Sequence, residues 1–182
     1  MHNNLLDDNS LEIETKNVKY PSKGARFGAA FIDGTIINFA SKALSSVIIA
    51  GDLTGGIWSV AFMTLIWPIY KIGLEGTQGA TLGKKAMNIQ VVKEDGYFSP
   101  LTLADANRRF LLWWPMYILS FFSALLAAQP GPSDWLIALI GILTVGAFIL
   151  YMGCVLSIFS NERGKTWHDK VGGTICVQAD SL

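Results

Sequence analysis

The sequence predicts an all-α membrane protein in which four transmembrane helices form two hairpins and carry a small cytoplasmic β cap. Of the 182 residues, 51% are hydrophobic and only 15% are charged, whereas soluble domains carry about 25% charged residues. Four apolar segments are long enough, or almost long enough, to cross a bilayer as helices. Nearly all lysines and arginines lie in the segments that would face one side of that bilayer.

The four apolar segments supply the crossings, because the hydrocarbon core of a bilayer requires roughly 20 mostly apolar residues per helix. They cover about residues 27–50, 57–74, 110–128 and 135–159. The last two contain no charged residue. A surface helix of a soluble protein would show a polar face at helical period, so the uncharged segments favour insertion into a membrane.

The positions of the basic residues predict the orientation of these helices. Thirteen of the fourteen lysines and arginines lie before the first segment, in or next to the loop 75–109, or after the fourth segment. Cytoplasmic flanks of membrane helices are enriched in these residues, so both termini and this loop are expected in the cytoplasm. The exception, Lys42, can snorkel to the outer interface. We therefore divide the chain into a polar tail at 1–20, a membrane domain at 21–178 and a short tail at 179–182.

The predicted cytoplasmic segments contain local structure of their own. Residues 87–93 and 173–178 are expected to pair as two short strands. Residues 99–109 are predicted to form an amphipathic helix at the membrane interface. The cytoplasmic segments also resemble each other at a constant offset of 85 residues, as for Thr81 and Thr166. This similarity either reflects a parallel repeat of two helices and a cytoplasmic segment or is coincidental.

An acidic residue inside the first apolar segment is a candidate for a functional site. Asp33 lies two helical turns beyond Arg26, so the two side chains share one helix face about 10 Å apart. A charge at this depth is costly unless it is paired or hydrated. Asp33 is therefore either a site for a cation or proton, or part of a structural clamp to the cytoplasmic segments. Asn38 is expected to hydrogen-bond to a neighbouring helix.

The last charged motif contains His168 and Asp169, followed by Lys170. A histidine beside an aspartate can relay protons, but the same pair can form a salt-bridged turn at the membrane surface. The sequence shows no nucleophile with a nearby base, no metal-ligand cluster and no phosphate-binding loop. It therefore predicts no enzyme, metal site or cofactor. The zero formal net charge gives no indication of nucleic-acid binding, and Cys154 and Cys176 are expected to stay unpaired.

Several short motifs, taken in order, resemble the RDD family of integral membrane proteins. They are Gly24-Ala25-Arg26-Phe27 with Asp33, Thr81-Leu82-Gly83-Lys84, Val91-Val92 before Asp95-Gly96, and Thr166-Trp167-His168-Asp169-Lys170. The family is named after an arginine and two aspartates, and the matching positions are Arg26, Asp33 and Asp169. The resemblance covers about residues 20–178. Many relatives have a second arginine where this chain has Phe27, which weakens the case for a paired cationic cluster.

The resemblance implies a membrane function, and two hypotheses follow. In the first, the protein is a small transporter of a bacterial inner membrane. It exchanges Na⁺ or Li⁺ for H⁺ at Asp33 as a homo-oligomer, and an ion pair between Arg26 and Asp169 gates or orients the first helix. The expected supporting residues are His168, Asn38, Lys170 and Arg109.

In the second hypothesis, the protein is a non-transporting adaptor that recruits a membrane protein partner through its cytoplasmic cap. The three charged residues of the family motif are then structural. The apolar character of the third and fourth segments favours this hypothesis, because a pore would need a more hydrophilic lining.

Overall fold

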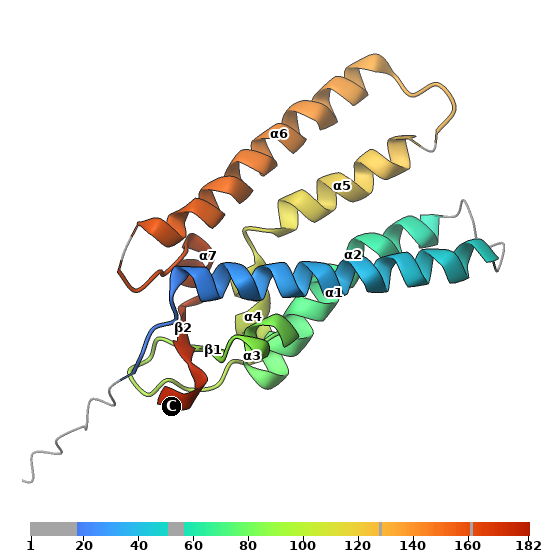
Figure 1. The fold of residues 1–182 in the computed structure, drawn as a ribbon. Coiled ribbons are helices and arrows are strands. Elements are labelled where there is room, and N and C mark those ends of the chain that lie inside the picture. Colours follow the sequence, from blue (N-terminus) through green and yellow to red (C-terminus); the bar gives the residue numbers. More distant parts are fainter. Residues whose placement is uncertain (1–17, 51–56, 128, 161) are drawn as a thin grey trace, which may run out of the picture.

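The computed structural model describes residues 18–50, 57–127, 129–160 and 162–182, and it is mainly helical (Figure 1). Four long helices extend in broadly the same direction: α1 (Lys23–Ala50), α2 (Ile57–Gln78), α5 (Trp114–Ala127) and α6 (Asp134–Leu156). The first described residues and the C-terminus lie at the same end of these helices. Most of the tail predicted at 1–20 and the connection at 51–56 lie outside the described residues.

Short elements form a cap at that end of the long helices. They are α3 (Leu82–Ala86), β1 (Ile89–Lys93), α4 (Leu103–Phe110), the 3₁₀ turn η1 (Ser157–Phe159), α7 (Trp167–Gly172), β2 (Thr174–Gln178) and the 3₁₀ turn η2 (Ala179–Ser181). As predicted, the two strands pair: β1 runs antiparallel to β2, with Val91 opposite Cys176. Most residues of both strands are buried, so the core of the molecule lies in the cap.

The register of the two strands is symmetrical about its centre. The residue 85 positions after Val91 is Cys176, which is also its partner across the sheet. Ile89 pairs with Gln178 at one end of the sheet. The residue 85 positions after Ile89 is Thr174, the residue 85 positions before Gln178 is Lys93, and these two pair at the other end. A two-fold axis between equivalent halves produces this kind of self-consistent pairing. The register therefore supports the parallel repeat over coincidence.

The third predicted crossing begins with a bend. The carboxylate of Asp105 accepts a hydrogen bond from the backbone N–H of Thr102, and this capping box starts α4. A 70° bend separates α4 from α5. Pro115 lies in the first turn of α5, where its missing N–H breaks no helical hydrogen bond. The straight part of the predicted segment 110–128 is therefore α5, and the amphipathic helix expected at 99–109 corresponds to α4.

One helix in the described part of the chain has the length and composition of a membrane span. The stretch Asp134–Phe159 is long and apolar enough to cross a bilayer, and the bent pair of α4 and α5 would be a second crossing if it formed one span. Among the described residues, no further helix meets this criterion. The count of four crossings therefore stays a prediction.

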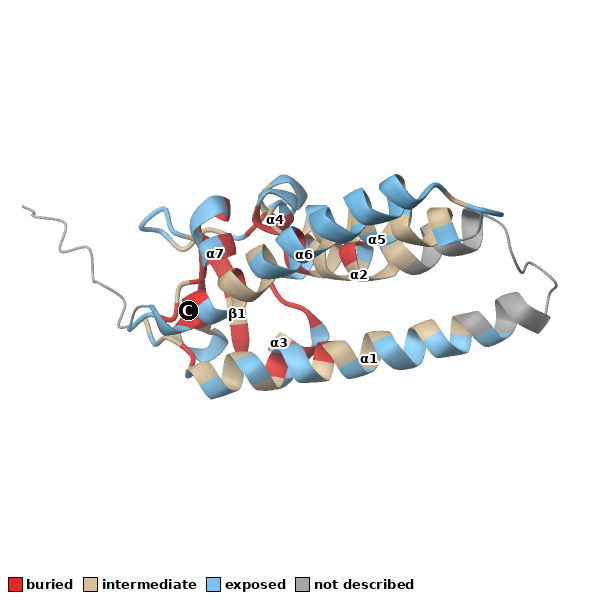
Figure 2. Cartoon of the chain, turned by 90° about the horizontal axis from the view of Figure 1, so that it is seen from above, coloured by how far each residue is buried: buried red, intermediate tan, exposed pale blue. Residues whose placement is uncertain are grey.

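The long helices expose apolar side chains. Among the described residues, α5 buries none, and α6 buries only Ala147 and Cys154. Phe31 on α1 is 76% exposed and Ile142 on α6 is 71% exposed. In Figure 2 the buried residues concentrate around the cap, whereas exposed residues extend along the helices. Extensive exposed apolar surface marks a contact with a membrane or a protein, which agrees with the membrane helix.

We predict that Gly83→Ala destabilises the protein, because a Cβ atom there would collide with the backbone carbonyl oxygen of Ala29 where α3 packs against α1. The expected cost is about 1–3 kcal/mol. Gly73→Ala is the matched control, since nothing lies within 4 Å of a Cβ atom at that helical position. Thermal unfolding in detergent should show a lower melting temperature for the first variant only. An unchanged Gly83→Ala protein would contradict the close approach of α3 to α1.

Candidate functional site

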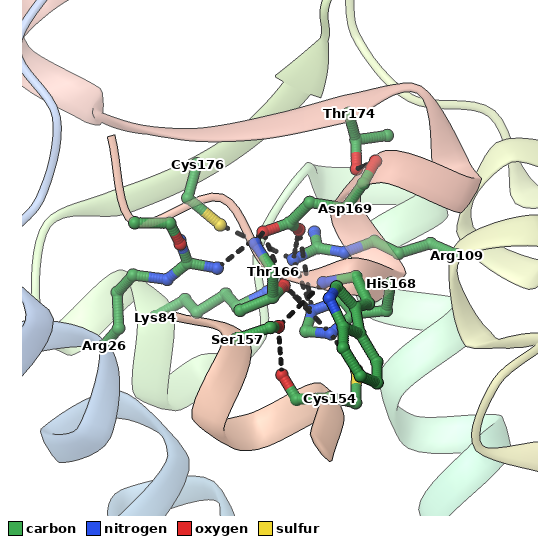
Figure 3. Close-up of polar contacts among 12 residues, drawn as sticks. Arg26, Lys84, Arg109, Cys154, Ser157, Thr166, His168, Asp169, Thr174 and Cys176 are labelled. Atoms are coloured by element: carbon green, nitrogen blue, oxygen red, sulfur yellow. Dashed lines mark hydrogen bonds and ion pairs between the residues drawn. The ribbon is translucent and has the colours of Figure 1, made fainter. Parts of the chain in front are cut away.

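A buried aspartate holds α7 against α1 and α4 (Figure 3). The side chain of Asp169 has no exposed surface. Its Oδ2 atom accepts a hydrogen bond from Nη2 of Arg26 at 2.8 Å, and its Oδ1 atom lies 2.5 Å from Nη2 of Arg109. Arg26 also donates to the carbonyl oxygen of Gly164, which precedes α7. One carboxylate thus joins three helices.

The ion pairs continue beyond Asp169. Nη1 of Arg109 lies 3.3 Å from Oε2 of Glu75 near the end of α2, and Nζ of Lys84 in α3 donates to Oε1 of Glu75 at 2.6 Å. We call the resulting series of alternating charges the charge chain; it consists of Lys84, Glu75, Arg109, Asp169 and Arg26. Glu75 and Arg109 are each only 2% exposed. Their burial is tolerable because each contacts opposite charges.

Local sequence positions the carboxylate of Asp169. Oδ2 accepts hydrogen bonds from the backbone N–H of Thr166 at 3.0 Å and from its hydroxyl at 2.7 Å, which closes a capping box at the start of α7. The helix ends at Gly172 and is capped by Gly173, whose φ of 62° suits glycine. A Cβ atom at Gly172 would lie 2.9 Å from the Cβ of Arg109. Glycine at this position therefore lets α7 approach α4 closely.

His168 lies beside the charge chain as a buried imidazole. Nη2 of Arg109 lies 3.2 Å from its Nε2 atom. A guanidinium can only donate, so Nε2 accepts and the proton lies on Nδ1. Nδ1 is 3.1 Å from Sγ of Cys154 and 3.0 Å from Oγ1 of Thr166. Burial lowers the pKa of His168 well below its usual value, and the attraction of Asp169 does not offset this effect. The ring is therefore neutral at pH 7.

The pKa of Asp169 reflects the opposite balance of forces. Burial alone would raise this pKa, but the guanidinium groups of Arg109 and Arg26 outweigh burial and hold it well below the usual range for an aspartate. The hydrogen bond from Arg26 acts in the same direction. The carboxylate is therefore charged throughout the physiological pH range, as the centre of the charge chain requires.

Asp33 lies in a second, separate cluster and is 5% exposed. It accepts hydrogen bonds from the hydroxyls of Tyr70 and Thr81, each at 2.6 Å, and from the backbone N–H of Gly83 at 2.7 Å. These donors come from α2 and from the start of α3, so Asp33 ties α1 to both elements. Within the described part of the chain, no hydrogen bond or ion pair joins Asp33 to Arg26.

A comparison with protein families covers most of the chain. The family model of the RDD family matches residues 20–173, a stretch that contains Arg26, Asp33 and Asp169. The chain belongs to the RDD family. The resemblance carried by the short motifs is thereby confirmed. No curated protein and no solved structure matches the chain.

The residues predicted for the site of this RDD-family protein do not all lie in one cluster. The charge chain and its immediate surroundings contain Arg26, Asp169, Arg109 and His168. Asp33 occupies the second cluster. Asn38 and Lys170 are exposed, and neither side chain has a hydrogen bond or ion pair to the described residues. The hydrogen bond expected from Asn38 to a neighbouring helix is therefore not formed within the described part of the structure.

Sequence reasoning missed the residues that complete both clusters. Glu75 and Lys84 extend the charge chain, and the hydroxyls of Tyr70 and Thr81 hold Asp33. Thr81 has a usable signal: it lies 85 residues before the N-cap of α7 and is itself the N-cap of α3. Glu75 has a weaker signal, as an acidic residue just after an apolar segment.

A cavity of about 450 Å³ lies next to both clusters. Its lining comes from α1, α2, α6 and the cap, and the charged lining residues are Arg26, Asp33, Lys71, Lys84 and Arg109. In the described part of the chain, no group of three or more histidine, cysteine or acidic side chains is arranged to hold a metal ion. Basic and aromatic groups therefore dominate the chemistry available at the cavity.

We predict that Asp169→Asn destabilises the protein strongly, because it leaves Arg26 and Arg109 buried without the carboxylate that neutralises them. Breaking a buried ion pair in this way costs about 3–5 kcal/mol. Asp180→Asn is the control, since Asp180 is exposed. The yield and melting temperature of detergent-solubilised protein should fall for the first variant only. Wild-type stability of Asp169→Asn would show that the fold does not depend on the charge chain.

We also predict that acid destabilises the protein. The pKa of His168 is depressed in the folded state, so below about pH 6.5 the unfolded chain binds a proton that the folded chain excludes. Asp169 has a depressed folded pKa too, and it adds to the loss as the pH falls below about 4. Melting temperature should therefore decrease from about pH 6.5 downwards, and His168→Gln should flatten the upper part of this decrease. If the melting temperature of that variant fell with pH as steeply as that of the wild type, His168 would not be the group responsible.

Proposed function

We propose that this RDD-family protein is a multi-pass protein of a bacterial inner membrane, with α1, α2, α5 and α6 as its crossings and both termini in the cytoplasm. The apolar stretch Asp134–Phe159 and the outward-facing apolar side chains of the helices support this placement. Apart from Lys42 and Lys71, the described basic residues lie in the cap or at the ends of helices next to it. This bias supports a cytoplasmic cap.

Within the membrane, the geometry favours a non-transporting adaptor that presents a rigid cap to a membrane protein partner, and not an enzyme. The observation behind this proposal is that protein groups engage the family's charged residues. Asp33 accepts from three donors, one of which is the backbone N–H of Gly83. A backbone N–H can only donate, so it cannot reorient to coordinate a cation as a hydroxyl can. The carboxylate of Asp169 is likewise paired with the guanidinium groups of Arg26 and Arg109, and it accepts a hydrogen bond from the backbone N–H of Thr166.

Cation/proton exchange is the second candidate, and the position of Asp33 on the cavity wall favours it. To exchange Na⁺ or Li⁺ for H⁺, this carboxylate would have to release the hydroxyls of Tyr70 and Thr81 and titrate near the working pH. Transport sites form between repeats or bundles that move against each other. Four helices enclose little room for such a movement, so exchange would require a homo-oligomer.

Ion flux separates the two functions. Purified protein would be placed in vesicles containing a pH-sensitive dye, and Na⁺, Li⁺, K⁺ or choline would be added outside. We predict no cation-dependent proton movement for the wild type, for Asp33→Asn or for the control Asp134→Asn, which changes an exposed acid on α6. Asp33→Asn should instead lower stability by about 1–2 kcal/mol, because an amide replaces a charged acceptor of three hydrogen bonds.

The opposite result has an equally clear meaning. Cation-dependent proton movement in the wild type that disappears in folded Asp33→Asn and persists in Asp134→Asn would establish an exchanger with Asp33 as its carrier. If folded wild-type protein shows no flux, the adaptor proposal requires that a specific membrane protein co-purify with it from native membranes.

A further inference from the structure

The cavity next to the charge chain is amphipathic. Its lining residues include Arg26, Lys84 and Arg109 at the cap end, and Ala30, Trp67 and Val155 along the helices. The volume of about 450 Å³ is within the range of roughly 300–1,000 Å³ that is typical of small-molecule sites. One end of the cavity thus suits a charged group, and the other end suits hydrocarbon.

The charges around the cavity do not cancel. Three of its four basic residues belong to the charge chain, whose two acids neutralise them only in part. The fourth, Lys71, forms no ion pair with the described residues; its Nζ atom lies 4.6 Å from the ring centroid of Trp113. Counting Asp33 with the two acids of the charge chain, four basic residues face three acidic ones. The cavity therefore has an excess positive charge.

Buried donors at the cavity lack acceptors. Nε1 of Trp67, Nε1 of Trp113 and Nε of Arg109 are buried and have no hydrogen-bond acceptor among the described residues. Buried polar groups in proteins are nearly always paired. Each of these nitrogen atoms has less than 1 Å² of accessible surface, so a ligand with acceptor oxygens would pair with them once the neighbouring side chains shift, whereas a metal cation would leave them unpaired.

We propose that this cavity binds the phosphate group of an anionic phospholipid, with the acyl chains lying along α1 and α6. The phosphate oxygens accept hydrogen bonds from Lys71 and the indole N–H groups, and the negative charge of the lipid balances the excess positive charge. The hydrocarbon of the lipid covers the apolar end of the lining. The cavity is lined by residues of both α1 and α6, so lipid is expected to enter between these helices.

Lipid binding to detergent-solubilised protein tests the proposal. Native mass spectrometry would measure the binding of phosphatidylglycerol and of phosphatidylcholine with identical acyl chains. The key variant is Lys71→Gln, because Lys71 stands outside the charge chain. The control is Lys170→Gln, which removes an exposed cation on the cap side, outside the cavity lining. Trp67→Phe is a second cavity variant, which removes one indole donor and retains an aromatic ring.

The wild type and Lys170→Gln should bind phosphatidylglycerol at least about tenfold more tightly than phosphatidylcholine. Lys71→Gln should weaken phosphatidylglycerol binding about tenfold, as expected for one charge-assisted hydrogen bond, and Trp67→Phe should weaken it severalfold. Equal binding of the two lipids by the wild type, or unchanged binding in both folded cavity variants, would overturn the proposal. Displacement of the lipid by millimolar inorganic phosphate would also overturn it, by showing that the site recognises phosphate without a lipid.

Discussion

Two guanidinium groups, from Arg26 in α1 and Arg109 in α4, approach the single carboxylate of Asp169 in α7. Removing such charges from water is costly, and only close pairing in the protein interior compensates for it. The capping box with Thr166 fixes the position of that carboxylate. The position of the cap against the long helices and the close approach of α4 to α7 at Gly172 both follow from this arrangement.

The internal repeat explains why the first half needs Asp33. Thr81 and Thr166 are N-caps at equivalent positions, but the third helical residue is Lys84 after the first and Asp169 after the second. Asp169 caps its own helix, whereas a lysine cannot accept hydrogen bonds. In the first half an acid from α1 does this instead, since Asp33 accepts hydrogen bonds from the start of α3. Lys84 is then available for the acid at the end of α2. The two aspartates of the family motif thus have equivalent capping roles.

Sequence patterns could predict the long helices and the strand pair, because apolar runs and β-branched alternation are local signals. They could not select the partner of Arg26: Asp33 lies seven residues away on the same helix, whereas Asp169 lies 143 residues away. That choice depends on how α7 docks, which is a tertiary property. α3 and α7 have only five and six residues, too few to show helical periodicity. Glu75 adjoins a predicted crossing, and only the folded structure shows it between two cations.

The sign of the charge around the cavity affects whether a cation or an anion binds there. A sodium ion at Asp33 would share its surroundings with four basic side chains, and repulsion between like charges is stronger in a partly dry site than in water. It would also have to displace the donors that Asp33 accepts from at the start of α3, so each binding event would loosen the attachment of the cap to α1. An anion meets the reverse situation, because Lys71 and the unpaired donors are the groups that the charge chain does not use. The pairing that holds the cap together therefore also makes the adjacent cavity selective for negative charge.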